Sequence, residues 1–343
     1  METSIMRQAI MTAPGTIEFR DIPAPSPAPG HVLLRILRIG VCGSDVHVNH
    51  GKHPYTKYPV VQGHEFSAII ESLGPNVSNL RPGQKVTSMP QIVCGQCPPC
   101  RRGDYHICDH LRVEGFQAPG CAQDLFPVPA DRIVPLPDNF TPEQGALVEP
   151  TAVAVHATSR AANLAKQNVV VLGAGPIGNL VGQVARASGA NVLITDLSDF
   201  RLEVAARCGL TLTSNAAKEP LPDAVKRAFN GQGFSVALEC VGVETTISAA
   251  VSNIAKGGTI VAVGVFAEKP RIDLGLLQDR ELRILGTLMY KREDYQQAVH
   301  LIASAQVITL PLESRHFPFA QYADAYKYID QQADKCVKVF IDL

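Results

Sequence analysis

The sequence predicts an α/β protein in which a doubly wound, parallel-sheet domain is joined to a second, β-rich domain. Three observations support this fold class: short apolar runs alternate with helical patterns in mid-chain, β-type runs precede them, and a strand-like run ends the sequence. The apolar runs are NVVVL (168–172), ANVLITD (190–196), FSVALE (234–239) and GTIVAV (258–263). Continuous apolar runs of this length are typical of parallel strands that are buried on both faces.

The first 150 residues predict the β-rich domain. They contain the β-type runs HVLLRILRIGVC (31–42), FSAIIESLG (66–74) and DRIVPLP (131–137), with turn signals such as RPGQKV between them. Near residue 150 the pattern changes to the alanine-rich helical segment TAVAVHATSRAA, after which strands and helices alternate. We therefore expect a partly barrel-like domain over residues 1–150 and the doubly wound domain over 151–285.

The bulk composition excludes two classes of partner. The 343 residues carry a net charge of −1, so the chain lacks the basic surplus that nucleic acid or an anionic membrane attracts. No apolar run reaches the length of about 18 residues that a membrane-spanning helix requires. The amino-terminal run METSIMRQAIMTAPG has no apolar signal core, so we expect a reducing, cytoplasmic location for the nine cysteines.

Four cysteines lie within fifteen residues, in the run CGQCPPCRRGDYHIC. Cys94, Cys97, Cys100 and Cys108 have the spacing C-x2-C-x2-C-x7-C, which allows four thiolates to converge on one tetrahedral Zn²⁺. Such a site is closed: it can hold a loop but offers no open position to a substrate. Disulfides, an iron–sulfur cluster and a nucleic-acid-binding zinc ribbon are alternatives, and the spacing favours structural zinc over them.

A glycine-rich motif predicts a dinucleotide site. Gly173, Gly175 and Gly178 form G-x-G-x-x-G between the strand NVVVL and a helix, and Asp196 ends the next predicted strand. The glycines allow a tight turn, close approach of the pyrophosphate, and close packing of the helix on the strand. Asp196 is expected to bind ribose hydroxyls and to repel a 2′-phosphate, which favours NAD over NADP. NADP stays an alternative cofactor because of Arg201, since an arginine near this position either tolerates that phosphate or lies against adenine.

A second set of metal-ligating residue types lies outside the cysteine run. Cys42 lies in VCGSDVH, and His64 and Glu65 lie in QGHEFS. Glu149 lies in LVEP, just before the change of pattern, where a cleft between the domains is expected. A catalytic zinc needs three protein ligands and one open position, which Cys42, His64 and a carboxylate supply. Glu65 and Glu149 are the two candidate carboxylates.

Together these motifs resemble the zinc-dependent medium-chain dehydrogenase/reductase (alcohol dehydrogenase) superfamily, in particular its sorbitol (polyol) dehydrogenase branch. The resemblance covers essentially the whole chain. It rests on C-G-S-D-V-H (42–47), G-H-E (63–65), the cysteine run (94–108), V-E-P-T-A-V-A-V-H-A (148–157) and G-A-G-P-I-G (173–178).

The resemblance implies a domain order and an assembly. Residues 1–150 are expected to form a GroES-like catalytic domain with a structural-zinc lobe at 94–108, and residues 151–285 a Rossmann NAD-binding domain. Residues 286–343 are expected to return and complete the catalytic domain. A homo-oligomer, either a dimer or a tetramer, is also implied.

The resemblance also assigns roles to individual residues. Cys42 and His64 match the family's zinc ligands. Glu65 matches the glutamate that ligates zinc in sorbitol dehydrogenases, and Glu149 matches one that reaches zinc directly or through water. Asp45 matches a residue that buttresses the zinc-bound histidine. The residues expected to contact the cofactor are Gly173, Gly175, Pro176, Ile177, Gly178, Asp196, Arg201, Val241 and Gly264.

The expected reaction is oxidation of a secondary hydroxyl to a ketone, with hydride transfer to the nicotinamide. Zinc is expected to act as a Lewis acid on the hydroxyl, with Glu65 and Glu149 at the same centre. Ser44, two residues after Cys42, is the expected first proton relay. By resemblance the cofactor ribose follows, and then His47 near the surface.

Substrate contacts are predicted by resemblance alone. Tyr55, Phe116, Tyr290 and Lys291 fall on segments that line the cleft in relatives. Met289 stands where sorbitol dehydrogenases commonly carry arginine, which argues against a strict sorbitol enzyme. Lys291 either meets a carboxylate or phosphate or belongs to a solvated basic turn. The predicted substrate is a small polyol, sugar acid or sugar phosphate.

Other functions stay open at this point. A threonine- or butanediol-type secondary alcohol dehydrogenase has the same scaffold, and a zinc-stabilised binding protein without activity is an alternative of a different class. A zinc-free quinone reductase is disfavoured, because such relatives lack Cys42, His64 and the cysteine run.

Overall fold

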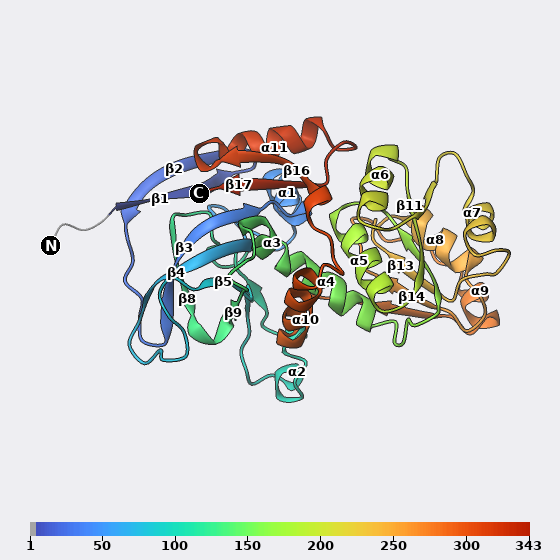
Figure 1. Cartoon of the computed structure of the whole chain (residues 1–343), viewed down its shortest axis with the longest axis horizontal. Helices are drawn as coiled ribbons and strands as arrows, with labels where there is room; N and C mark the ends of the chain where they lie inside the picture. The colour runs from blue at the N-terminus through green and yellow to red at the C-terminus, as the bar shows by residue number, and fades with distance from the viewer. Residues whose placement is uncertain (1–4) are drawn as a thin grey trace. The chain divides into compact units, whose positions relative to one another are not determined.

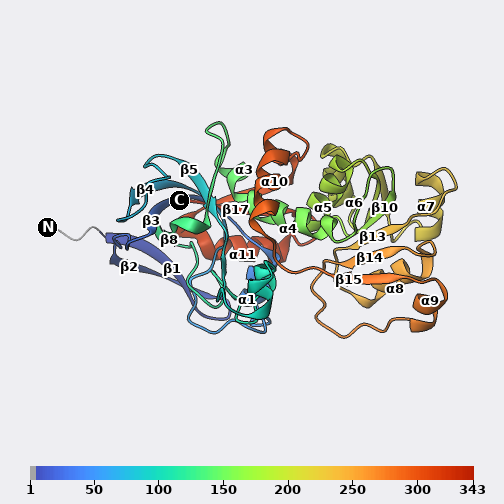
Figure 2. The same cartoon turned by 90° about the horizontal axis from the view of Figure 1, so that it is seen from below.

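The computed structural model describes residues 5–343, and residues 1–4, which begin the amino-terminal run considered above, lie outside the described part. The chain divides into two compact units (Figures 1 and 2). Unit 1 holds the described residues up to Glu149 together with Glu313–Leu343, and unit 2 holds Pro150–Leu312. Unit 1 is β-rich and unit 2 is α/β with a parallel sheet, which confirms the predicted fold class.

Unit 2 is built around its parallel sheet. The strands are β10 (Asn168–Leu172), β11 (Asn191–Asp196), β12 (Leu212–Asn215), β13 (Val236–Glu239), β14 (Thr259–Ala262) and β15 (Arg283–Gly286). They pair in the order β12-β11-β10-β13-β14-β15. Val169, Val170 and Val171 are fully buried, as strands covered on both faces require. Because the strand order reverses between β10 and β13, their carboxyl ends form the switch point at which such sheets bind ligands.

Helices accompany the sheet of unit 2. They are α4 (Val148–Ser159), which crosses the division between the units, α5 (Pro176–Ala187), α6 (Asp199–Arg207), α7 (Leu221–Ala228), α8 (Glu244–Asn253), α9 (Leu274–Asp279), α10 (Arg292–Ala303) and the short 3₁₀ helix η3 (Leu310–Leu312). Figure 2 shows α5 and α6 on one side of the sheet and α8 and α9 on the other. Both faces of the apolar strands are thereby shielded from water.

The chain returns to unit 1 later than the sequence predicted. Residues 286–312, expected in the return segment 286–343, belong to unit 2. The reason is that β15 pairs with β14, and α10 is tied to α4 by a hydrogen bond between His156 Nδ1 and Asp294 Oδ2 at 2.9 Å. The return therefore begins at Glu313.

Unit 1 combines a large sheet with two small strand pairs. Its strands are β1 (Ile5–Ala13), β2 (Thr16–Pro23), β3 (His31–Gly40), β4 (Glu65–Leu73), β5 (Lys85–Ser88), β6 (Gln91–Ile92), β7 (Arg112–Val113), β8 (Leu125–Pro129), β9 (Ile133–Pro135), β16 (Glu313–Pro318) and β17 (Lys338–Asp342). Its helices are α1 (Gly43–Asn49), α2 (Pro98–Arg101), α3 (Pro142–Ala146), α11 (Tyr322–Gln331) and the 3₁₀ helices η1 (Tyr105–Ile107), η2 (Ala130–Arg132) and η4 (Phe319–Gln321). The large sheet runs β16-β17-β3-β4-β5-β9, and β8 also pairs with β3.

The carboxyl-terminal strand β17 lies inside this sheet, between β16 and β3. Phe340 of β17 lies opposite Gly40 of β3, and Gly40 lies opposite Glu65 of β4. Three segments that are far apart in the sequence therefore meet at the end of β3. The candidate site forms there.

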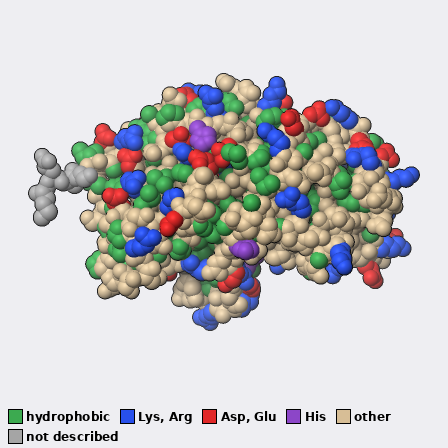
Figure 3. Space-filling view, viewed as in Figure 1, with side chains coloured by type: hydrophobic (Ala, Val, Ile, Leu, Met, Phe, Trp, Pro, Cys, Tyr) green, Lys and Arg blue, Asp and Glu red, His purple; other side chains and the backbone are tan. Residues whose placement is uncertain are grey.

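No helix within residues 5–343 combines the length and the apolar character needed to span a membrane. On the face drawn in Figure 3, basic and acidic side chains are interspersed. This distribution agrees with the small net charge.

Candidate functional site

The end of β3 and the start of β4 bring three metal-ligating side chains together. Cys42 lies just after β3, at the start of α1. His64 precedes β4, and Glu65 is the first residue of that strand. One ligand atom from each of these residues lies within 4.8 Å of the other two. His64 and Glu65 are buried and Cys42 is partly buried, so little water reaches the group.

The chemistry of this group fits a zinc ion. Donors about 2.0–2.3 Å from a tetrahedral zinc lie roughly 3.3–3.8 Å apart, and sulfur, nitrogen and oxygen are its usual ligand atoms. Burial, together with the charge of Glu65, raises the pKa of the Cys42 thiol. Burial by itself lowers the pKa of His64, but Asp45 and Cys42 raise it well above its usual value. A divalent cation opposes both shifts, because it binds a thiolate and a neutral imidazole.

Asp45 of α1 contacts the residues that carry two of these ligands. Its Oδ2 accepts a hydrogen bond from Cys42 N at 3.0 Å, and its Oδ1 lies 3.6 Å from His64 Nδ1. Asp45 is buried, and burial raises its pKa although the charge of His64 opposes the rise. Asp45 thus lies on the Nδ1 side of His64, and its buttressing role stays a prediction.

A buried lysine that the sequence analysis did not identify pairs with Glu65. Lys338 Nζ forms an ion pair with Glu65 Oε2 and donates to Val41 O at 3.0 Å. Gly40 leaves room for the pair, since a Cβ there would lie 2.6 Å from Glu65 Oε2. Burial by itself lowers the pKa of Lys338, but Glu65 and Cys42 raise it, so Lys338 is a positive charge beside the group. Its signal in the sequence is a lysine inside the apolar run CVKVF.

Glu149 lies near this group without belonging to it. Among the described residues, its carboxylate is not one of the ligand atoms within 4.8 Å of one another. Glu149 is buried, and its charge raises the pKa of both His64 and Lys338. Of the two candidate carboxylates, Glu65 is the one placed against Cys42 and His64.

The two predicted proton-relay residues lie on α1, the helix that begins beside Cys42. Ser44 is partly buried and His47 is exposed. On this helix His47 thus reaches solvent, whereas Ser44 is partly covered.

The predicted substrate residues of unit 1 belong to a row of rings in contact with one another. The ring centroid of Phe116 lies 4.7 Å from that of His53 and 4.9 Å from that of His64. Tyr55 is 73% exposed and meets His53 edge-on at 6.2 Å. Burial, followed by the charges of His47 and His64, lowers the pKa of His53. His53 thus presents a neutral imidazole one ring away from the metal-ligating group, a placement that the sequence analysis missed.

The four cysteines of residues 94–108 converge on one another. Their sulfur atoms lie within 4.8 Å of one another. Cys108 Sγ lies 3.8 Å from Cys97 Sγ and 3.5 Å from Cys94 Sγ, close to the spacing of roughly 3.8 Å that four sulfurs around zinc adopt. The backbone N–H groups of Gln96 and Cys97 lower the pKa of Cys94 to about 6, which favours a thiolate. The donor set fits a closed zinc site.

We expect the substitution Cys97→Ser to reduce stability before it reduces catalysis. A structural zinc contributes folding free energy, so its loss should lower the melting temperature by at least about 5 °C. Melting curves, zinc content and turnover below the melting transition are the measurements. Cys208→Ser, at a buried thiol of unit 2 whose Sγ donates to Ile308 O, serves as the matched control. Lost turnover in a Cys97 variant with the wild-type melting temperature would contradict the structural role.

The glycine motif of unit 2 lies at the carboxyl end of β10. Gly173 has φ = +97°, which favours glycine. A Cβ on Gly178 would clash with Gly173 O, so the absence of a side chain lets α5 pack against this turn. Gly175 is the N-cap of α5, and Pro176 and Ile177 begin the helix. The N–H groups of that first turn are available to an anionic ligand.

Asp196 lies at the end of the neighbouring strand β11. Its Oδ2 accepts a hydrogen bond from Ala174 N at 2.7 Å, and its Oδ1 accepts one from Ser198 N at 2.9 Å. These bonds hold the carboxylate against the glycine motif. Arg201 lies in the first turn of α6, where its N–H donates to Ser198 Oγ at 3.2 Å.

Val241 and Gly264 lie at the same edge of the sheet, after β13 and β14. A Cβ on Gly173 would lie 2.7 Å from Val241 Cγ2, and one on Gly264 would clash with Gly242 N. Glu239, which the sequence analysis missed, is fully buried, and its Oε1 accepts hydrogen bonds from Val241 N and Gly242 N at 2.9 Å each. This carboxylate anchors the turn that carries Val241. Its signal is a lone acidic residue at the end of the run FSVALE.

Tyr290 and Lys291 lie in unit 2, at the start of α10. Tyr290 is fully buried, and its ring packs edge-on against Tyr295 with centroids 5.0 Å apart. Lys291 is the N-cap of α10, and its N–H donates to Asp294 Oδ2 at 2.7 Å. Met289, just before them, has φ = +51°. The turn is thus held by packing and by the cap of α10.

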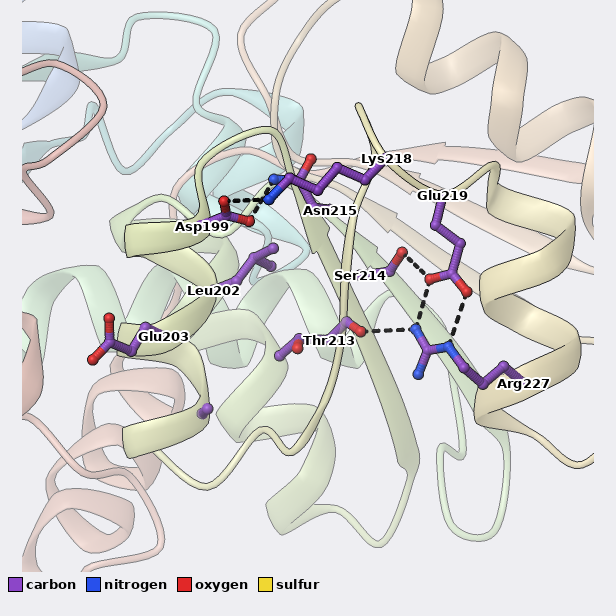
Figure 4. Close-up of a pocket in the computed structure, with 10 residues that line it drawn as sticks. Asp199, Leu202, Glu203, Thr213, Ser214, Asn215, Lys218, Glu219 and Arg227 are labelled. Atoms are coloured by element: carbon purple, nitrogen blue, oxygen red, sulfur yellow. Dashed lines mark hydrogen bonds and ion pairs between the residues drawn. The ribbon is translucent and has the colours of Figure 1, made fainter.

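A surface pocket of unit 2 lies between α6, β12 and α7 (Figure 4). Four of its charged side chains form two pairs: Lys218 Nζ lies 2.6 Å from Asp199 Oδ2, and Arg227 binds Glu219 at 2.7 Å. The residues predicted to contact the cofactor are not among those that line it. We therefore do not assign the cofactor to this pocket.

Two family models match the chain, each over a different part. Residues 28–138 match a model described as the alcohol dehydrogenase GroES-like domain. Residues 176–304 match a model described as a zinc-binding dehydrogenase. The first match lies within unit 1 and the second within unit 2.

Individual proteins match nearly the whole chain. L-galactonate-5-dehydrogenase of Escherichia coli is 32% identical over 94% of this chain and 95% of its own length. Sorbitol dehydrogenase 2 of Saccharomyces cerevisiae is 34% identical over 95% of this chain and 94% of its own. The crystal structure of galactitol-1-phosphate dehydrogenase from Escherichia coli is similar with a TM-score of 0.91 and 27% identity, covering 98% of this chain and 100% of that one.

Proposed function

The chain belongs to the zinc-dependent medium-chain dehydrogenase/reductase superfamily, in its polyol dehydrogenase-like branch, and we propose on this basis that it oxidises a secondary hydroxyl of a polyol, sugar acid or sugar phosphate to a ketone, with NAD as hydride acceptor. The observation that carries the proposal is the buried sulfur, nitrogen and oxygen group of Cys42, His64 and Glu65. A zinc bound by these residues would keep one position open for the substrate.

We assign the catalytic zinc to this group and a structural zinc to the cysteine run 94–108. When bound, the catalytic zinc supplies a Lewis acid that lowers the pKa of a substrate hydroxyl. Asp45 orients His64, and Lys338 balances part of the negative charge that Cys42 and Glu65 bring to a buried place. We place Glu149 beside the zinc as a charge that tunes its neighbours.

The proton released by the substrate hydroxyl needs a route to water. We assign its first acceptor to Ser44 and its release to His47, the exposed histidine on the same helix. An imidazole has an ordinary pKa close to neutral, so it exchanges protons with solvent readily at physiological pH.

We assign the nicotinamide cofactor to the carboxyl edge of the unit 2 sheet. The residues are the glycine motif 173–178, Asp196, Val241 and Gly264, and the first turn of α5 would meet the pyrophosphate. The Asp196 carboxylate lies against the motif, where it would bind ribose hydroxyls and repel a 2′-phosphate. This placement supports NAD over NADP.

For the substrate we assign Phe116, Tyr55 and His53 in unit 1 as contacts. A neutral imidazole both donates and accepts hydrogen bonds, which suits a chain of hydroxyl groups. In unit 2, Tyr290 and Lys291 stay as predicted contacts, with Lys291 suited to a carboxylate or phosphate. The relatives named above act on sugar acids, polyols and polyol phosphates by their names, which supports the same class here.

A substrate panel tests the proposal. Polyols, aldonates, sugar phosphates, threonine and 2,3-butanediol are each offered with NAD and with NADP, and nucleotide reduction is followed by absorbance. We expect the highest kcat/KM on a polyol, aldonate or sugar phosphate, with NAD preferred about tenfold or more. Activity confined to threonine or butanediol would replace the substrate class. No activity in a protein that holds zinc in the cysteine run alone would favour a binding protein.

We also propose a cytoplasmic homo-oligomer, a dimer or tetramer. The strand β15 ends the unit 2 sheet, and an edge strand offers N–H and C=O groups to a strand of a second copy. The nine cysteines are free thiols, which suits a reducing compartment.

A further inference from the structure

A buried chain of polar side chains connects the carboxyl-terminal helix of unit 1 to the metal-ligating group. The hydroxyl of Tyr326, on α11, donates to Gln62 Oε1 at 2.8 Å. Gln62 Nε2 in turn donates to Asp45 O at 3.2 Å and approaches Asp45 Oδ1 at 3.5 Å. Asp45 then contacts Cys42 N and faces His64 Nδ1. The path therefore runs from a helix near the end of the chain to two metal ligands.

Each member of this path is buried. Tyr326 and Gln62 are each 2% exposed and Asp45 is 1% exposed. A buried polar group that loses its partner costs about 1–3 kcal/mol, so such groups stay in the arrangement that satisfies them. Tyr322, also on α11 and buried, packs its ring against that of Tyr326 with the centroids 5.8 Å apart.

The partners of Gln62 determine which way its amide points. Its oxygen accepts from the Tyr326 hydroxyl and its nitrogen donates to the Asp45 carbonyl. If the amide were turned over, its oxygen would face the carbonyl oxygen of Asp45, and the two acceptors would repel. Tyr326 therefore holds the N–H group of Gln62 toward Asp45.

This orientation bears on the histidine ligand. A carboxylate that accepts the Nδ1 proton of a histidine holds the ring in the tautomer whose Nε2 lone pair is free for a metal. Asp45 faces His64 Nδ1 with Oδ1 at 3.6 Å while its Oδ2 accepts a hydrogen bond from Cys42 N, so rotation of its carboxylate would disturb its contacts with both ligands. The amide of Gln62 supplies the contact that opposes such rotation.

We propose that Gln62 and Tyr326 are positioning residues of the catalytic metal site, which hold Asp45 in the orientation that prepares His64 for zinc. The proposal rests on the assignment of zinc to Cys42 and His64. Neither residue touches the ligand atoms of that group, and both act through Asp45. The carboxyl-terminal helix α11 thereby sets the metal affinity of a site built at the other end of the sequence.

The test compares Tyr326→Phe and Gln62→Leu with the wild-type protein, purified with zinc. Zinc affinity is measured by competition with a chromogenic chelator, and the absorption spectrum is recorded after cobalt(II) replaces zinc. Partners that orient a ligand typically contribute 10- to 100-fold in affinity. We expect the affinity for the zinc assigned to Cys42 and His64 to fall about tenfold in Gln62→Leu and a few-fold in Tyr326→Phe. The cobalt absorption bands of that site should change as well. The zinc of the cysteine run should be unchanged.

The matched control is Tyr328→Phe, which removes a tyrosine hydroxyl from the same helix and leaves in place its ring, which contacts Phe317 with the centroids 5.6 Å apart. It should keep wild-type metal affinity and cobalt spectrum. Urea unfolding of each variant separates a general loss of stability from a change at the metal site. If Gln62→Leu does not fold, Tyr326→Phe still tests the proposal, because it removes only a hydroxyl group and preserves the packing of the core.

Two results would overturn the proposal. The first is unchanged affinity and spectrum in folded Tyr326→Phe and Gln62→Leu, with about two zinc ions still bound per chain; this outcome leaves the proposed function intact. The second is a wild-type protein that binds zinc in the cysteine run alone, and this outcome removes the proposed function as well.

Discussion

Replacing Cys42 with serine is expected to reduce kcat/KM by on the order of 10³-fold or more, which corresponds to about 4 kcal/mol of transition-state stabilisation. The thiolate is the charged, soft ligand of the proposed site, and a serine hydroxyl stays neutral and binds zinc poorly. Burial already disfavours the Cys42 thiolate, since it raises the pKa of the thiol, so the site depends on the metal to form it. Zinc content should fall from about two ions per chain to about one.

Steady-state kinetics and metal analysis of the same preparation check this prediction. Cys208→Ser, at a buried thiol away from both cysteine-containing sites, controls for the loss of a sulfur atom. It should retain both zinc ions and full turnover. If Cys42→Ser turned over at the wild-type rate, the assignment of the catalytic zinc would be wrong.

Replacing Lys338 with methionine is expected to destabilise the zinc-free protein by about 3–5 kcal/mol, the usual cost of removing one partner of a buried ion pair. Lys338 and Glu65 are no more than 2% exposed, so water cannot take the place of the ammonium group. Zinc bound to Glu65 would compensate part of that charge. The loss of stability should therefore be smaller when zinc is present.

Urea unfolding with and without a zinc chelator measures both values. The double variant Lys338→Met, Glu65→Gln should recover most of the stability, because the buried charge is gone. Lys335→Met, at an exposed lysine nearby, is the matched control and should change stability by less than about 0.5 kcal/mol. A loss in Lys338→Met that is small, or equal in the two states, would contradict a Glu65 shared between zinc and Lys338.

The sequence predicted the parts of the fold that depend on local patterns. The runs that begin at Asn168, Asn191, Val236 and Thr259 form parallel strands. Continuous apolar residues suit such strands, because side chains on both faces of the sheet are buried. The boundary at residue 286 was placed too early. A strand followed by a helix looks alike in either unit, and the pairing of β15 with β14 decides to which unit the segment belongs.

In the candidate site, too, some residues were identified from the sequence and others only from the structure. Residue type and spacing identified Cys42 and His64 as ligand candidates, but left Glu65 and Glu149 as alternatives. The geometry places Glu65 in the group, because β4 begins at Glu65 directly opposite Gly40. His53 was missed, since nothing in its local sequence shows that it stacks on Phe116.

The sequence by itself determined the fold class, the glycine motif and the cysteine run, since each depends on residues that are close along the chain. The tertiary structure decided the surroundings of the metal-ligating group. Lys338 lies 297 residues from the Val41 carbonyl that it binds, and Tyr326 lies 264 residues from Gln62. Contacts of this range depend on strand register and on the packing of a whole core, so a buried lysine and a buried tyrosine acquire their roles when β17 and α11 close unit 1.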